Sequence, residues 1–404
     1  MAPPSSSSVP FKLLFSFQII SCIYSTLSFN MTWDKENTIK MPLAISSQLV
    51  CHLNDTVYFI GGRKTENNTL TSIDTVYMLN TSNNTFEKIG TIPGNAYFAS
   101  NYICHNDSIY MFGPATDDKS NNSSGAGHVW IFNTVNHKTQ RIPFPGNTDP
   151  VSLPCAVKNP MYKTVYIIGG KTSDGPASIS DQTLLFNYTS NSFINMTLPR
   201  MPTKLYASMG HFINNTKING TAGSKNAIIY IIGGEPSNKD ILQYNTTSNK
   251  WLTIGGNATL NEARSFTRTI YFEDSRENFI FIVGGGSPSS STNSFLNSTD
   301  IFYIGNYSVE PAFGDNLTYQ VQYNTISKYE DKIFVWGFYA KVNGTNDTYD
   351  NIKKIFTFKL PNDRKKVSTW VTIGIISGTC GFMLLCGCLS YIACAKSKKV
   401  EQNE

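Results

Sequence analysis

The hydrophobic positions of the chain recur as short runs rich in β-branched and aromatic residues, and six of these runs end in glycine. The glycines are Gly61-Gly62, Gly113, Gly169-Gly170, Gly233-Gly234, Gly284 to Gly286, and Gly337. Successive copies lie about 51 to 64 residues apart, which is the length of one four-stranded propeller blade. We therefore predict an all-β propeller of six blades, or of seven, because two copies are degenerate.

A second pattern follows the glycines and reads YNTTSNKW in its best copy, Tyr244–Trp251. Related copies stand at Leu79–Phe86, Phe132–Thr139 and Phe186–Phe193. Asparagine tolerates left-handed backbone and hydrogen-bonds its own main chain, so each copy predicts a tight hairpin between two strands. The glycines would supply positive φ or close backbone approach where blades crowd together.

Together these two motifs resemble the kelch repeat family over roughly residues 31 to 360. The resemblance implies a kelch-like β-propeller, to which we assign residues 29–362. Because kelch propellers include both binding modules and a copper oxidase, it implies little about function. The segment near Trp33 is expected to complete the last sheet beside Ile352–Leu360 and so remove its open edge.

The two ends of the chain predict a location. Residues 1–28 combine one cation, Lys12, with an apolar stretch and small residues spaced for cleavage, as in a secretory signal peptide. Residues 369–394 carry no charge and are long enough to span a bilayer as a helix, leaving a short cytoplasmic tail at 395–404. We predict a single-pass type I protein of the cell membrane with its propeller outside.

Sequons for N-glycosylation agree with that location, because all nineteen lie between the two apolar segments. An asparagine-rich and threonine-rich chain also produces sequons by chance. In an up-and-down blade, the turns between first and second strands and between third and fourth strands share one rim. The sequons predicted to carry glycans there are Asn54, Asn80, Asn106, Asn187 and Asn245.

Three cysteines lie between the signal peptide and the membrane segment: Cys51, Cys104 and Cys155. An odd number permits at most one internal bridge. We favour Cys51 with Cys104, although inner strands of neighbouring blades can be too far apart for a disulfide. The alternative is that all three fill the inner strands as small apolar residues.

Patterns that carry catalysis are not found. Galactose oxidase, which has a kelch-like propeller, binds copper with an adjacent Tyr-His pair, and no histidine of this chain follows a tyrosine. The glycines at 284–286 lack the lysine of a phosphate loop. We predict no enzyme, cofactor or metal site; the alternative is a membrane-tethered carbohydrate-active oxidase of galactose-oxidase type.

Charge is thinly spread, with 15% charged residues and a formal net charge of +5, which does not favour nucleic-acid binding. The membrane segment contains Gly374 and Gly378 in a Gly-x-x-x-Gly motif that Gly381 extends, so two such helices could pair as a homodimer. The partners expected are therefore the membrane, a second copy, and an extracellular ligand.

The predicted function is recognition or adhesion, with an extracellular protein or glycan bound by propeller loops. The opposite rim is expected to hold the ligand, because arginine and tyrosine are favoured interface anchors and the loops between second and third strands of the third and fourth blades lack sequons there. The predicted ligand-binding residues are Lys171, Arg200, Lys204, Tyr206, Glu235 and Arg264. The kelch resemblance implies an alternative, in which arginine in this link makes hydrogen bonds from blade to blade.

Overall fold

A computed structural model divides the chain into two compact units, Met1–Lys359 and Leu360–Glu404. The residues that it describes all belong to the first unit: 32–34, 45–46, 48–53, 56–66, 69–80, 85–92, 96–97, 102–116, 127–172, 178–214, 227–236, 238–273, 278–287, 294–312, 321–322, 325–329, 332–336, 339–341, 349–351 and 356–359. The predicted signal peptide, membrane segment and tail lie outside these residues. Within them, no helix has the length and hydrophobicity needed to cross a membrane.

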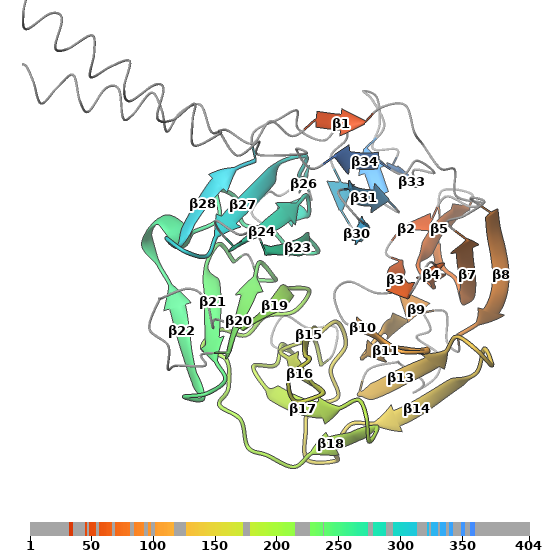
Figure 1. The fold of residues 1–404 in the computed structure, drawn as a ribbon, viewed down its shortest axis with the longest axis horizontal. Helices are drawn as coiled ribbons and strands as arrows, with labels where there is room; N and C mark the ends of the chain where they lie inside the picture. The colour runs from red at the N-terminus through yellow and green to blue at the C-terminus, as the bar shows by residue number, and fades with distance from the viewer. Residues whose placement is uncertain are drawn as a thin grey trace, which may run out of the picture. The chain divides into compact units, whose positions relative to one another are not determined.

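The described residues form an all-β propeller (Figure 1). Five four-stranded antiparallel sheets, called blades here, each come from one continuous segment, and their strand order follows the sequence. Blade 1 contains β3 (Leu49–Leu53), β4 (Thr56–Ile60), β7 (Thr75–Asn80) and β8 (Thr85–Thr91). Blade 2 contains β10 (Tyr102–His105), β11 (Ser108–Phe112), β13 (His128–Asn133) and β14 (Thr139–Pro143). Blade 3 contains β15 (Cys155–Asn159), β16 (Thr164–Ile168), β17 (Thr183–Asn187) and β18 (Ser192–Ile194). Blade 4 contains β19 (Met209–Asn214), β20 (Ala227–Ile232), β21 (Ile241–Asn245) and β22 (Lys250–Ile254). Blade 5 contains β23 (Arg268–Glu273), β24 (Asn278–Val283), β27 (Thr299–Tyr303) and β28 (Ser308–Pro311).

A further four-stranded sheet combines both ends of the propeller segment. It consists of β30 (Thr325–Tyr329), β31 (Lys332–Trp336), β34 (Phe356–Lys359) and β1 (Thr32–Asp34), with Trp33 opposite Phe358. This pairing confirms the predicted role of the segment near Trp33. The blades built from consecutive strands number five, one fewer than the six copies predicted, because strands of the last copy join this composite sheet instead.

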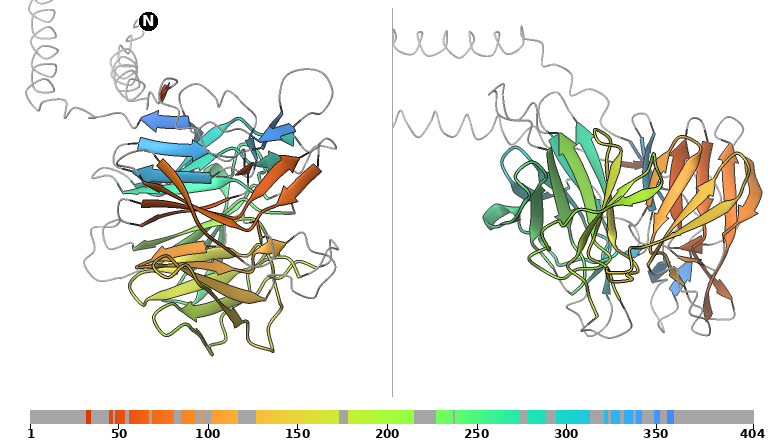
Figure 2. Two further views of the ribbon diagram at one scale, coloured as in Figure 1. Left: turned by 90° about the vertical axis from the view of Figure 1, so that its right-hand side faces the viewer. Right: turned by 90° about the horizontal axis from the view of Figure 1, so that it is seen from below.

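The innermost strands contact one another in the order β3, β10, β15, β19, β23 and β30, and β30 contacts β3 again. Figure 1 shows the sheets arranged in a ring, and Figure 2 shows the same sheets from two sides. Smaller sheets form in the segments between second and third strands and in the links before first strands. They are β2 (Ile45–Ser46) with β5 (Arg63–Glu66) and β6 (Thr69–Ser72), β9 (Ala96–Tyr97) with β12 (Ala115–Thr116), β25 (Gly286–Ser287) with β26 (Ser294–Phe295), and β29 (Val321–Gln322) with β32 (Tyr339–Lys341) and β33 (Tyr349–Asn351). One short 3-10 helix, η1, covers Gly256–Ala258.

The two ends of the blades carry different turns, and we name each end for its turns. The glycine rim is the end where second strands finish in glycine, at Gly169-Gly170 and Gly233-Gly234 for example. The hairpin rim is the opposite end, which carries the turn between β15 and β16 and the hairpin between β21 and β22. Asn80, Asn106, Asn187 and Asn245 lie at the hairpin rim, whereas Asn54 lies outside the described residues. Their glycosylation remains a prediction.

The core lies between the blades. Each of four apolar clusters draws on two neighbouring blades; the cluster between blades 3 and 4, for example, includes Tyr166 and Ile168 from one and Ile229 and Ile231 from the other. All residues of β16 and β20 are buried, because second strands are covered on both faces. The sequences of the second strands are therefore continuous apolar runs and do not alternate between apolar and polar residues.

The glycine pairs hold the link that enters the next blade. Gly233 has φ +66°, and a Cβ atom there would overlap the carbonyl oxygen of Arg264. That same oxygen accepts a hydrogen bond from the N–H of Gly234, at 2.9 Å. In blade 3, a Cβ atom of Gly169 would likewise overlap the carbonyl oxygen of Leu205, and this oxygen accepts a hydrogen bond from the N–H of Gly170. The first glycine thus provides space and the second provides a donor.

Blade 2 shows how the same contact survives without a second glycine. Pro114 follows Gly113 and has no N–H to donate. The carbonyl oxygen of Val151 lies where a Cβ atom of Gly113 would be, and it accepts a hydrogen bond from Gly127 at 3.1 Å. Blade 2, whose repeat lacks the second glycine, therefore keeps the hydrogen bond to the link carbonyl through a donor from elsewhere in the chain.

The predicted asparagine hairpins are confirmed in blades 2, 3 and 4, whereas the turn of the copy at Leu79–Phe86 lies outside the described residues. The Oδ1 atom of Asn245 accepts hydrogen bonds from the N–H groups of Thr247 and Ser248, at 3.0 and 2.9 Å. Asn249 then adopts φ +57°. Asn187 and Asn133 make equivalent bonds in blades 3 and 2. Local asparagine chemistry therefore sets these turns, as the motif predicts.

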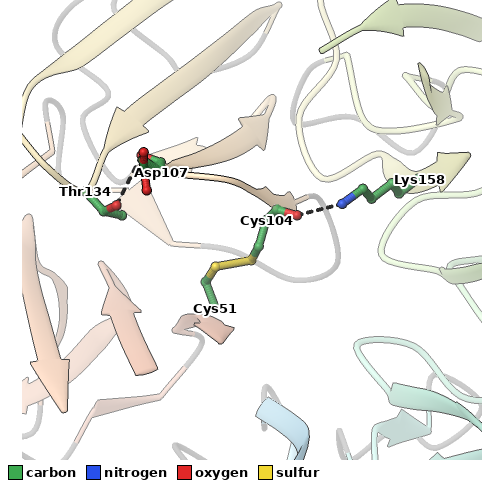
Figure 3. The surroundings of a disulfide bond; sticks show 5 residues. All are labelled: Cys51, Cys104, Asp107, Thr134 and Lys158. Atoms are coloured by element: carbon green, nitrogen blue, oxygen red, sulfur yellow. Dashed lines mark hydrogen bonds between the residues drawn. A yellow bond between two sulfur atoms is a disulfide. The ribbon is translucent and has the colours of Figure 1, made fainter. Parts of the chain in front are cut away.

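Cys104 connects three inner strands (Figure 3). Its side chain forms a disulfide with Cys51 of β3, the pair favoured from sequence, and the Cα atoms are 6.0 Å apart. Its carbonyl oxygen accepts a hydrogen bond from Nζ of Lys158 in β15, at 2.8 Å. Cys155 is a free, buried thiol, and burial raises its pKa to about 12.

His211 in β19 gives the fold a predicted pH dependence. Its Nε2 atom lies 2.7 Å from the hydroxyl of Thr269 in blade 5, and burial lowers the pKa of the ring from 6.5 to about 4. Below pH 6.5 the imidazole of His211 is protonated in the unfolded chain, whereas in the folded chain it stays neutral until the pH falls to about 4. Stability is therefore expected to fall as pH falls through this window, by at most about 3 kcal/mol.

Urea unfolding of the wild type and His211→Gln at pH 7.5 and pH 5 measures this contribution. Glutamine keeps a hydrogen-bonding group beside Thr269 but does not titrate, so the variant should lose less stability between the two values. His105, whose pKa is also lowered, is common to both proteins and cancels in the comparison. Equal losses in the two proteins would contradict the prediction.

Candidate functional site: a row of polar side chains on the glycine rim

The site is built from a backbone pairing that repeats in successive blades. The residue after a glycine pair forms an antiparallel bridge with the link residue that enters the same blade: Lys171 with Ser152 in blade 3, Glu235 with Tyr206 in blade 4, and Gly286 with Ser265 in blade 5. Each bridge has two backbone hydrogen bonds of 2.7 to 3.0 Å. The pairing places side chains from three blades on one rim.

Four of these side chains form a continuous row, which we call the link row: Lys171, Tyr206, Glu235 and Ser265. The Tyr206 hydroxyl donates to Oε2 of Glu235, and the Ser265 hydroxyl donates to Oε1 at 3.0 Å. Nζ of Lys171 lies 5.7 Å from the centre of the Tyr206 ring, in cation–π contact. The sequence predicted three of the four members, and the structure brings those three together.

The rings and backbone beneath the row hold it in place. Tyr206 meets Phe266 edge-on, with ring centres 6.3 Å apart. Leu153, Ala207 and Phe266 form a buried apolar cluster, and all three have φ between 50° and 53°. A backbone hydrogen bond of 3.1 Å joins Ala207 to Leu153, and another joins Phe266 to Ala207. Left-handed backbone at non-glycine residues is retained only where surrounding contacts enforce it.

Two predicted ligand-binding residues are exposed but separate from the row. Arg200 forms an ion pair with Asp181, at 2.5 Å, with its own side chain 69% exposed. Lys204 is exposed, and among the described residues no hydrogen bond or ion pair joins it to the row. Their position in the link towards blade 4 therefore does not bring them to Glu235.

Arg264 corrects the predicted set, because its side chain is buried and cannot line an open surface. The guanidinium donates to the carbonyl oxygens of Gly284 and Ser298, at 3.1 and 3.2 Å, and pairs with Asp300 at 2.7 Å. All of these partners belong to blade 5. Arg264 therefore has a structural role, as in the alternative, but its side-chain bonds run to blade 5 and not from blade to blade.

Ser265 is the member of the row that sequence reasoning missed. A signal was present, because the links Val151 to Pro154, Leu205 to Ser208 and Arg264 to Thr267 each precede an inner strand. Aligning them puts Ser152, Tyr206 and Ser265 at one position, and the structure gives all three the same bridge.

The chemistry of the row is that of polar recognition. A carboxylate has about four acceptor positions, so Glu235 retains capacity after accepting from two hydroxyls. An ammonium group has three donors and an aromatic ring offers an apolar edge. Within the residues that the structure describes, no three His, Cys, Asp or Glu side chains converge on a point that could hold a metal ion.

Comparison of the chain with protein-family models and with curated proteins finds no match, so the propeller and its link row are assigned on their geometry.

Proposed function

We propose that this chain is a kelch-type recognition or adhesion module that binds an extracellular protein or glycan at the link row. The observation that carries the proposal is the shared carboxylate of Glu235, held by hydroxyls from two different links. Such a group is positioned before a ligand arrives, which reduces the ordering cost of binding. Hydroxyl-rich ligands suit it, because they donate to a carboxylate and accept from an ammonium.

The setting of the module is part of the proposal. The composite sheet of β30, β31, β34 and β1 would act as the sixth blade, since β30 contacts inner strands of both blade 5 and blade 1. The signal peptide at 1–28 and membrane helix at 369–394 would anchor the propeller outside the cell as a type I protein. Glycans on the hairpin rim would leave the link row accessible.

The test is binding of the purified full-length chain to an array of neutral and acidic glycans, followed by variants against any glycan retained. Glu235→Gln and Tyr206→Phe should each weaken binding about tenfold, as expected for one hydrogen bond to a charged group. Arg200→Gln is the matched control, because it removes an exposed charge of the same region outside the row.

Three outcomes would contradict this assignment. A folded Glu235→Gln variant with unchanged affinity would remove the row from the site. Equal weakening by Arg200→Gln would move the site towards the blade 3 to blade 4 link. Stoichiometric copper in the purified protein would favour the oxidase alternative.

A further inference from the structure

The order of side chains in the link row is set by hydrogen bonds between blades. The second glycine of each pair donates its N–H to the carbonyl of the link that enters the next blade, at 2.8 Å from blade 3 and 2.9 Å from blade 4. The residue after that glycine therefore lies beside the residue after that carbonyl. Lys171 lies beside Tyr206 in this way, and Glu235 lies beside Ser265.

Two opposite charges contact the same tyrosine. Nζ of Lys171 lies over the Tyr206 ring, 5.7 Å from its centre, whereas the carboxylate of Glu235 accepts from the hydroxyl of that ring. Lys171 and Glu235 are both among the described residues, and no ion pair joins them to each other. The row therefore presents an ammonium and a carboxylate that one aromatic ring holds apart.

Backbone bonds hold both charged residues in place. Lys171 and Ser152 exchange two backbone hydrogen bonds of 2.7 and 2.8 Å, and the Ser152 hydroxyl also donates to the Lys171 carbonyl, at 3.2 Å. Glu235 and Tyr206 exchange two of 2.9 and 3.0 Å. The side chains of Lys171, Tyr206 and Glu235 are half-buried, so a ligand can reach groups whose freedom is already restricted.

The carboxylate suits hydroxyl donors better than a basic side chain. Each oxygen of Glu235 already accepts one hydrogen bond, from Tyr206 or from Ser265. A guanidinium binds a carboxylate best through two parallel bonds to both oxygens. The acceptor positions that remain on Glu235 suit hydroxyls that donate one bond each. The ammonium of Lys171, in contrast, binds an anionic acceptor most strongly.

We propose that the link row binds an acidic sugar residue, with Lys171 holding its carboxylate or sulfate group and Glu235 accepting from its hydroxyls. This inference rests on the proposed function, because it names the ligand class of the same row. An acidic sugar carries both kinds of group on one small ring. A neutral sugar lacks the acidic group, and an acidic peptide lacks the adjacent hydroxyls.

Three acidic polysaccharides and their neutral forms test the inference on the full-length chain, after enzymatic removal of its own N-glycans. The pairs are polygalacturonate and hyaluronan with their methyl esters, and dextran sulfate with dextran. At least one acidic form should bind about tenfold more tightly than its neutral partner, as expected for one charged hydrogen bond. Lys171→Gln should remove this difference, whereas Glu235→Gln should weaken both forms alike, because both carry hydroxyls.

Controls separate this site from general attraction between a basic protein and a polyanion. Lys239→Gln is matched to Lys171→Gln, because it removes an exposed lysine from the segment between β20 and β21 on the same rim. It should preserve the difference between acidic and neutral forms. A difference lowered equally by Lys239→Gln would overturn the inference. So would binding of polyglutamate, which has carboxylates but no hydroxyls, as tight as that of the best acidic polysaccharide.

The same measurements distinguish failure of this inference from failure of the proposed function. Equal affinity for acidic and neutral forms, weakened in both by Glu235→Gln, would overturn the acidic ligand and keep the row as the binding site. Binding that a folded Glu235→Gln variant leaves unchanged would overturn both. No binding of any of the three acidic forms would overturn the acidic ligand alone.

Discussion

Replacing Arg264 by methionine is expected to lower the free energy of unfolding by about 3 to 5 kcal/mol, the cost of leaving one member of a buried ion pair alone. Arg264 and Asp300 have exposed side-chain fractions of 0% and 2%, so water cannot solvate the remaining carboxylate. The substitution also removes donors from the carbonyls of Gly284 and Ser298. Urea unfolding of the full-length protein measures the loss.

Two further variants identify the cause. Arg200→Met breaks an ion pair whose arginine is 69% exposed, and it should change stability by about 1 kcal/mol or less. Combining Arg264→Met with Asp300→Leu should recover part of the loss, because no buried charge then remains unpaired. A loss in Arg264→Met no larger than that in Arg200→Met would show that the buried pair is not a main support of blade 5.

Replacing Gly233 by alanine is expected to destabilise the propeller by about 3 kcal/mol or more, through left-handed backbone and overpacking together. Its φ is +66°, and the added Cβ atom would overlap the carbonyl oxygen of Arg264. Backbone cannot move aside as a flexible side chain can. The contact between blades 4 and 5 must therefore open or shift.

Two other glycines separate these contributions. Gly256 has φ +71° with no atom within 4 Å of a built Cβ, so Gly256→Ala should show the backbone cost alone, about 1 to 2 kcal/mol. Gly146 also has open space and no positive φ, so Gly146→Ala should be neutral or slightly stabilising. If Gly233→Ala loses no more free energy of unfolding than Gly256→Ala, then close packing against the carbonyl of Arg264 is not the reason that position 233 requires glycine.

Much of the propeller could be predicted because its signals are local. Second strands are buried on both faces, so they read as unbroken apolar runs. Asn245 and Asn187 form their turns with N–H groups only two and three residues away. The pairing of β1 with β34 could be predicted because the last sheet had no fourth strand behind Ile352–Leu360, and an open sheet edge must be covered. The count of continuous blades was less predictable, because the last copy shares its sheet with the N-terminal strand.

The candidate site depended on information that no local pattern contains. Tyr206 and Glu235 are 29 residues apart, and Ser265 is a further 30 residues along, yet one carboxylate joins them. Arg264 is the neighbour of Ser265 in sequence, but its side chain enters blade 5 while Ser265 faces Glu235. Both residues are buried, yet one supports Glu235 and the other the interior of blade 5, and their neighbouring positions in the sequence do not distinguish these roles.

The sequence by itself determined the all-β class, the repeat length, the hairpins and the covering of the final edge, whereas it left the pairing of Cys51 with Cys104 open. These follow from burial periodicity and from the backbone preferences of glycine and asparagine, which act over a few residues. Tertiary structure alone decided which polar side chains meet. Blades 4 and 5 pack so closely that Gly233 leaves space for the carbonyl oxygen of Arg264 and Gly234 donates a hydrogen bond to it. This packing between blades decides whether each link side chain is buried, paired or exposed.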